Sequence, residues 1–93
     1  MKHAGTAALD RLEPLLKAIR KREGLKEKSR GCFYRADRGF LHFHEHGEDE
    51  YFADIRLKGD DFDRLDVSTG VQRKSLLRQI DSALADGKAR RKR

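Results

Sequence analysis

The stretch Phe40-Leu41-His42-Phe43-His44-Glu45-His46 decides the fold. Its apolar and polar residues alternate, and alternation with a period of two is typical of a strand with one buried face. We therefore predict that Leu41 and Phe43 enter the core. His42 and His44 would then project together from the opposite face, and the third histidine of the stretch continues their row.

Two further segments, residues 31–35 and 51–57, have strand character on either side of it. Residues 36–39 form a tight turn with their glycine in the left-handed position, and residues 46–50 form a polar loop of hairpin length. This order predicts an antiparallel meander. Residues 62–67 fit either a short fourth strand or an irregular edge.

An amphipathic helix is expected before the meander. Pro14 is comfortable only in a first helical turn, so the main helix either begins near Leu12 or Glu13 or follows a short turn, and Gly24 is a natural stop. The apolar stripe of this helix comprises Leu9, Leu12, Leu15, Leu16 and Ile19.

A second helix is expected after the meander. Thr69 and Gln72 have the spacing of a capping box, Val71 stands at the start of the apolar stripe, and Gly87 ends the helix. The rest of the stripe comprises Leu76, Leu77, Ile80 and Leu84.

These elements predict an α+β fold: an N-terminal helix, an antiparallel meander of three or four strands, and a C-terminal helix. Two helices cannot easily cover both faces of a sheet, so both should pack on one face. Residues 1–93 form a single domain with an ordered core at about residues 7–86. The first six residues should be frayed, and the basic tail at residues 88–93 should be disordered.

Composition narrows the class of protein. Charged residues make up 41% of the chain and hydrophobic residues 37%, and Cys32 is the only cysteine. No hydrophobic run approaches the length of a membrane span. We therefore expect a cytoplasmic protein with a reduced thiol and no membrane contact.

The net charge of +6 would suit an anionic partner such as nucleic acid, but its distribution weakens that reading. Residues 1–30 hold nine Lys or Arg against four Asp or Glu, and residues 67–93 hold eight against two. Residues 31–66 hold five against ten. The expected sheet is therefore acidic, and only the two ends are basic.

The register of the second hairpin follows from polarity, because a slip of one residue exchanges the two faces. Pairing Leu41 with Ile55 points both inward and closes the loop naturally. That register sets His42 opposite Asp54, and the next histidine of the row opposite Phe52. The carboxylate should then raise the His42 pKa.

The first hairpin is less well determined. A bulge at Gly39 would place Tyr34 beside His42 and Cys32 beside His44. The outer face would then carry Cys32, Tyr34, His42, His44, Phe52 and Asp54, with Phe40 and Arg56 towards one edge.

Imidazoles beside a carboxylate can bind zinc or another borderline metal. His42, His44 and Asp54 are the candidate metal ligands, and Tyr34 joins them as a candidate ligand-binding residue. The same face could instead take a small anion, or the His–Asp pair could be purely structural. A histidine held by the aspartate could also act as a general base. No motif for a catalytic nucleophile accompanies these residues, however, so no catalytic residue is assigned.

The strands also carry a resemblance. It rests on Gly31-Cys32-Phe33-Tyr34-Arg35, Phe40-Leu41-His42-Phe43-His44-Glu45 and Ala53-Asp54-Ile55-Arg56. These segments resemble the strand core of a group of short bacterial hypothetical proteins, in which a C-terminal helix follows. The likeness spans residues 30–85 and implies a bacterial protein, but it supplies no chemistry because that group has no assigned activity.

The function predicted first is a non-enzymatic interaction module that forms a homodimer through its open sheet face, anchored by Tyr34, Phe40 and Phe52. The first alternative is weak binding of a divalent metal, such as zinc, or of a small anion at the His/Asp cluster. The second alternative is nonspecific nucleic-acid binding through the basic helices and tail.

Overall fold

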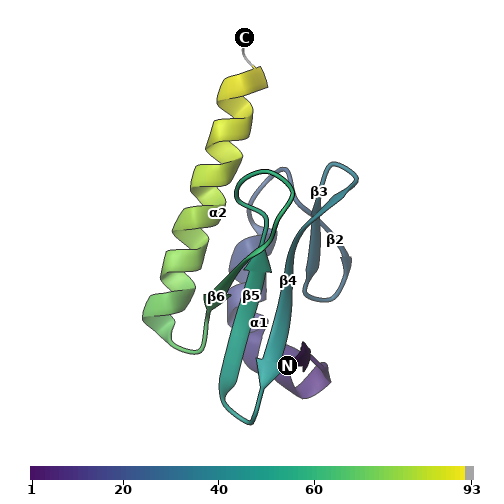
Figure 1. Cartoon of the computed structure of the whole chain (residues 1–93), viewed down its shortest axis with the longest axis vertical. Helices are drawn as coiled ribbons and strands as arrows, with labels where there is room; N and C mark the ends of the chain where they lie inside the picture. The colour runs from purple at the N-terminus through teal and green to yellow at the C-terminus, as the bar shows by residue number, and fades with distance from the viewer. Residues whose placement is uncertain (92–93) are drawn as a thin grey trace.

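The computed structural model describes the backbone of residues 1–91 and the side chains of residues 1–85. Two helices accompany one antiparallel sheet of six strands, which confirms the α+β fold (Figure 1). In chain order the elements are β1 (Lys2–His3), α1 (Thr6–Arg20), β2 (Lys26–Ser29), β3 (Cys32–Arg35), β4 (Arg38–His46), β5 (Glu50–Ile55), β6 (Asp63–Asp66) and α2 (Gly70–Arg91).

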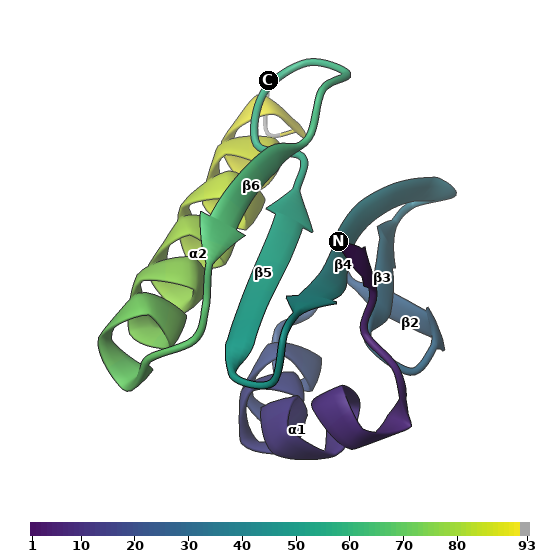
Figure 2. The same cartoon turned by 60° about the horizontal axis from the view of Figure 1, so that its bottom comes forward.

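The predicted meander runs from β3 to β6, so the segment left open at residues 62–67 contains a fourth strand. Two strands were missed. β2 extends the sheet beyond β3, and β1 pairs with the half of β4 that β3 does not reach (Figure 2). Within residues 1–6, which were expected to be frayed, Lys2 and His3 are therefore part of the sheet, and Thr6 begins α1.

β2 was missed because its sequence, Lys-Glu-Lys-Ser, has no apolar alternation. It is held instead by polar contacts. Arg20 of α1 donates to the Glu27 carboxylate at 2.6 Å, and the backbone N–H of Gly31 donates to the same carboxylate at 2.8 Å. Gly31 turns the chain into β3 with φ 80°, in the left-handed region that glycine enters at little cost.

α1 is continuous and holds Pro14 in its interior. The prediction that the main helix begins near Leu12 or Glu13 is therefore wrong. Pro14 lacks an N–H and removes one bond to the preceding turn, but burial of the apolar stripe outweighs that loss. The buried residues of the stripe are Ala8, Leu12, Leu15, Leu16 and Ile19. The helix stops before Gly24, which lies in the left-handed region with φ 97°.

The turn between β3 and β4 differs from its prediction. Ala36, and not Gly39, has the positive φ, at 55°. β3 ends at Arg35 and β4 begins at Arg38, which leaves only two residues for the turn. A turn this short sets the left-handed position at its first residue, ahead of the glycine.

A bulge follows this turn, but its extra residue is Phe40 and not the predicted Gly39. Tyr34 pairs with Gly39 while Phe33 pairs with Leu41, so Phe40 is the extra residue of β4. An extra residue interrupts the alternation of faces. The Phe40 ring enters the core and is 3% exposed, so its predicted place on the outer face is wrong.

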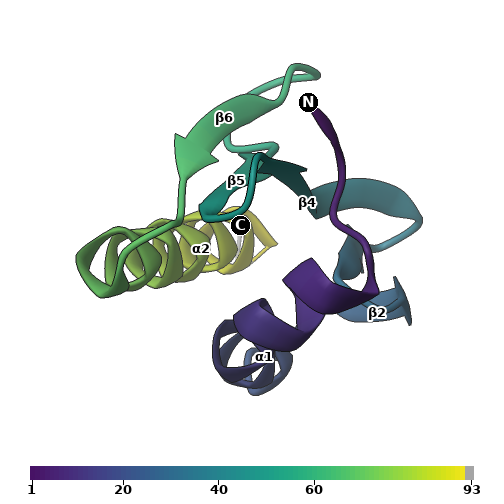
Figure 3. The same ribbon diagram turned by 90° about the horizontal axis from the view of Figure 1, so that it is seen from below.

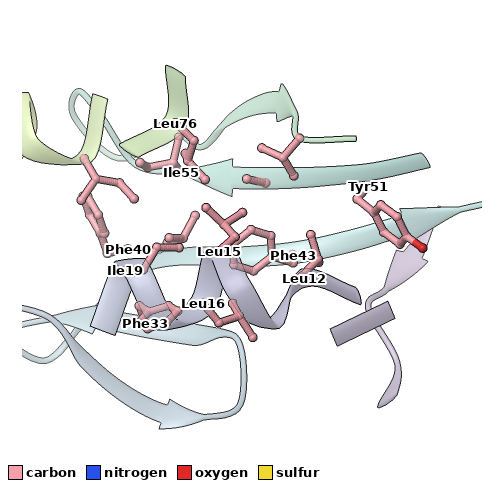
Figure 4. Packing of buried hydrophobic residues seen from close by; sticks show 14 of the residues in the cluster. Leu12, Leu15, Leu16, Ile19, Phe33, Phe40, Phe43, Tyr51, Ile55 and Leu76 are labelled. Atoms are coloured by element: carbon pink, nitrogen blue, oxygen red, sulfur yellow. The ribbon is translucent and has the colours of Figure 1, made fainter. Parts of the chain in front are cut away.

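Both helices cover the same face of the sheet, as expected (Figure 3). A single core lies between them and that face, and it includes Leu41 and Phe43 as predicted (Figure 4). The other large side chains of the core that are fully buried come from both helices and from the sheet and its flanks: Leu12, Leu16, Ile19, Phe33, Ile55, Val67, Leu76 and Ile80.

α2 begins with the predicted capping box. The Gln72 backbone N–H donates to the Thr69 hydroxyl, and the Gln72 side chain accepts from the Thr69 N–H. Two predictions for this helix are wrong. Val71 is exposed, and the helix continues through Gly87 to Arg91, since one glycine lowers helix stability without ending a helix. Residues 92–93 of the basic tail lie outside the described residues.

No helix in the described part of the chain combines the length and the apolar character needed to cross a membrane.

Candidate metal centre

The candidate site lies on the sheet face opposite the helices. β4 and β5 have the predicted register, with His42 opposite Asp54 and His44 opposite Phe52. Because Leu41 and Phe43 point into the core, the two histidines between and after them point away from it. The strand pair thus brings two imidazoles and one carboxylate to the same patch.

The two imidazoles converge on one carboxylate oxygen. His44 Nε2 lies 3.1 Å from Asp54 Oδ2, and His42 Nε2 lies 3.4 Å from the same oxygen. One ligand atom from each of the three residues lies within 4.8 Å of the others. This is the spacing of groups that could share one metal ion.

Arg64 of β6 completes the surroundings of the carboxylate. It pairs with Asp54 across the strands, and its guanidinium donates to both carboxylate oxygens, from Nε to Oδ1 at 2.8 Å and from Nη2 to Oδ2 at 2.9 Å. These hydrogen bonds lower the pKa of Asp54 and hold it as a carboxylate. Sequence reasoning missed Arg64 because the strand that carries it was left open.

His3 is the second residue that sequence reasoning missed. β1 sets it beside His44, and the two rings stack with centroids 4.6 Å apart. Its ring centroid lies 5.7 Å from that of His42. The predicted neighbour of His44, Cys32, belongs to β3, whose pairing with β4 ends at Leu41.

The histidine face is covered rather than open. His3 lies over one side of the cluster, and the Phe62 ring meets His42 edge-on with centroids 4.9 Å apart. The side chain of His44 is only 12% exposed and that of His42 25%. The centre of the face that was expected to lie open to a partner is therefore partly covered by the chain itself.

Burial also reverses the pKa expected for His42. Desolvation, which disfavours the imidazolium, is the largest effect and lowers the pKa, and the neighbouring His44 and His3 act in the same direction. The Asp54 carboxylate opposes this without overcoming it. His42 therefore favours the neutral form, which is the form that binds a metal ion.

Both ring nitrogens of His44 are buried and neither has a hydrogen-bond partner among the described residues. Nε2 lies close to Asp54 Oδ2 without forming a hydrogen bond to it. Buried polar atoms are nearly always satisfied, so each exception calls for an explanation. A cation bound at Nε2 would supply the missing partner of that nitrogen.

The other predicted site residues lie apart from the cluster. Tyr34 pairs with Gly39 at the far end of β4, and the Lys28 ammonium lies 4.3 Å from the centroid of its ring. Tyr34 therefore does not lie beside His42. His46 is exposed at the end of β4, opposite Glu50.

Comparisons of the chain with protein-family models, curated proteins and solved structures each found no match.

Proposed function

We propose that the protein is a small binding module that holds a divalent transition-metal ion such as zinc, with His42, His44 and Asp54 as ligands. The observation that carries the proposal is the convergence of both imidazole Nε2 atoms on Asp54 Oδ2. Neutral imidazole nitrogen and carboxylate oxygen are normal zinc ligands. Three protein ligands would leave a fourth position for water or for a partner's group.

Arg64 has two effects on such a site. It fixes the orientation of the Asp54 carboxylate, as hydrogen-bonding partners of ligating carboxylates commonly do. It also adds a positive charge beside the bound cation and occupies a lone pair of Oδ2. We therefore expect weak binding in the native chain and tighter binding once the guanidinium is removed.

A small anion has less support at this position, because the carboxylate of Asp54 lies at the centre of the cluster and would repel it. The chemistry of the cluster thus favours a cation over the anion considered from the sequence.

Calorimetric titration of the chain with zinc tests the proposal. The His42→Gln/His44→Gln double variant should lose binding, and Arg64→Gln should bind more tightly than the native chain. His46→Gln is the matched control, because it removes an exposed imidazole from the same strand and should bind as the native chain does. Equal binding by the double variant and the native chain would refute the proposal.

Self-association through this face stays a proposal with less support. Phe40, one of its expected anchors, lies in the core, and the histidines at the centre of the face are covered. Phe52 keeps partial exposure on the outer face. Sedimentation at micromolar concentration distinguishes a dimer from a monomer.

Nucleic-acid binding has less support as well. All four arginines of residues 1–30 form ion pairs: Arg20 and Arg30 with Glu13, Arg22 with Asp81, and Arg11 with Asp49. Hydrogen bonds from Arg20 and Arg30 lower the pKa of Glu13 to about 2. Charges paired in this way are less available to phosphates. The cytoplasmic location, inferred from the single cysteine, stays a proposal.

A further inference from the structure

A pocket lies at the end of the sheet where β4 begins, and none of its lining residues belongs to the histidine cluster. The start of β4 and the chain that leaves β5 enclose this pocket, whose volume is about 300 Å³. This volume is at the lower end of the range for small-molecule sites. Its lining includes three arginines, Arg35, Arg38 and Arg56, together with Phe40, Leu57 and two glycines.

The fold itself forces these arginines together. Arg35 and Arg38 are cross-strand partners at the β3–β4 turn. Arg56 follows β5 and is fixed to β4 by a 2.9 Å hydrogen bond from its backbone N–H to the Phe40 carbonyl. Like charges placed across a strand pair destabilise a sheet. A cluster of this kind therefore suits an anion that lies between the guanidinium groups.

Aromatic rings orient two of the three guanidinium groups. The central carbon of the Arg56 guanidinium lies 4.4 Å from the centroid of the Phe62 ring, and that of Arg35 lies 6.0 Å from the centroid of Phe40. Arginines stacked on rings lose less freedom when they bind a ligand. The Nε atom of Arg56 is also buried without a hydrogen-bond partner among the described residues.

The charge of the groups around the pocket indicates an anionic ligand. The carboxylate of Asp60 faces this cluster: it forms an ion pair with Arg38 and also feels the charge of Arg56. The residues that line the pocket include three guanidinium groups and no carboxylate, so the lining is positively charged. A phosphate monoester carries about −1.5 to −2 charges at neutral pH, and its oxygens match the planar guanidinium fork.

We propose that this pocket binds the phosphate group of a small phosphate monoester, with Arg35 and Arg56 as the principal contacts and Arg38 shared with Asp60. The proposal uses none of the candidate metal ligands and stands independently of the metal site.

Titrations with inorganic phosphate, glycerol 3-phosphate and dimethyl phosphate, followed by amide shifts in NMR spectra, test it. Both dianions should shift the signals of Gly39 and Arg56. Dimethyl phosphate, a singly charged model of the nucleic-acid backbone, should bind at least about tenfold more weakly. Equal binding of dimethyl phosphate would overturn the monoester assignment, and no shift with any of the three would overturn the site.

Substitutions localise the binding. Arg56→Ala and Arg35→Ala should each weaken it by about tenfold or more, the factor that corresponds to one charge-assisted hydrogen bond. Asp60→Asn should strengthen it, because it frees Arg38. Lys58→Ala is the matched control, since it removes a nearby exposed charge that does not line the pocket. Native affinity in a folded Arg35→Ala chain would contradict the proposal even if Arg56→Ala failed to fold.

Discussion

The ring of His3 stacks on the ring of His44 with centroids 4.6 Å apart. The contact joins the start of the chain to the middle of the sheet, and a 3.0 Å hydrogen bond from the Ala4 N–H to the Phe43 carbonyl supports it. The N-terminal segment is therefore a cover over the candidate metal centre.

Replacing His3 with alanine should loosen this cover without unfolding the domain. The Ala4 amide should exchange faster with solvent, because the stacking that keeps β1 on β4 is lost. Hydrogen exchange measured by NMR checks this. The Val67 amide, which follows β6 and donates to the Tyr51 carbonyl of β5, is the control and should keep its exchange rate. Unchanged exchange at Ala4 would show that the ring contact does not hold β1.

Phe43→Ala should lower the free energy of unfolding by roughly 3 to 5 kcal/mol, because it opens a cavity between the sheet and α1. Phe43 is buried under the helices, whereas Val71 is 77% exposed. Val71→Ala is therefore the control and should change stability by no more than about 0.5 kcal/mol. Urea unfolding of both variants gives the comparison, and similar effects in the two would contradict the assigned faces.

Ala36→Gly should stabilise the chain by about 1 kcal/mol, since Ala36 has φ 55° in a region that costs residues with a Cβ atom about this much. The neighbouring turn residue Asp37 has a negative φ, so Asp37→Gly should not stabilise. Thermal unfolding of the two variants checks the pair. A loss of stability in Ala36→Gly would mean that the turn has another conformation.

The free energy of unfolding should decrease as the pH falls, because of His42. Its folded pKa lies below the ordinary 6.5, so the unfolded chain takes up the proton first. In chelator-treated protein, this contribution to stability is complete above pH 6.5 and is lost as pH falls towards the folded pKa. His42→Gln should remove that part of the pH dependence. If the native chain instead gained stability relative to His42→Gln as the pH falls below 6.5, the effect of the Asp54 charge on the His42 pKa would outweigh the effect of burial.

The sequence predicted the centre of the site because two local signals agreed. The alternation along β4 set the faces, and the length of the loop after it set the register, which together placed His42 opposite Asp54. Arg64 and His3 could not be predicted in the same way. Their strands are four and two residues long, and partners far along the chain determine their pairing rather than any pattern of their own.

The position of the bulge was beyond sequence reasoning for a related reason: a bulge was predicted at Gly39, whereas the extra residue of β4 is Phe40. Alternation alone puts Phe40 on the histidine face, and only the space beneath the helices makes it favourable to insert an extra residue and bury the ring. That one residue changed the register of the first hairpin and separated Tyr34 from the site.

The most direct test of the central claim is a zinc titration followed through the ¹⁵N signals of the histidine rings. The account predicts that the Nε2 signals of His42 and His44 shift together and saturate at one zinc per chain, while the ring of His46 is unaffected. Equal responses from His46 and the two clustered histidines, or no response at all, would contradict a metal centre at His42, His44 and Asp54.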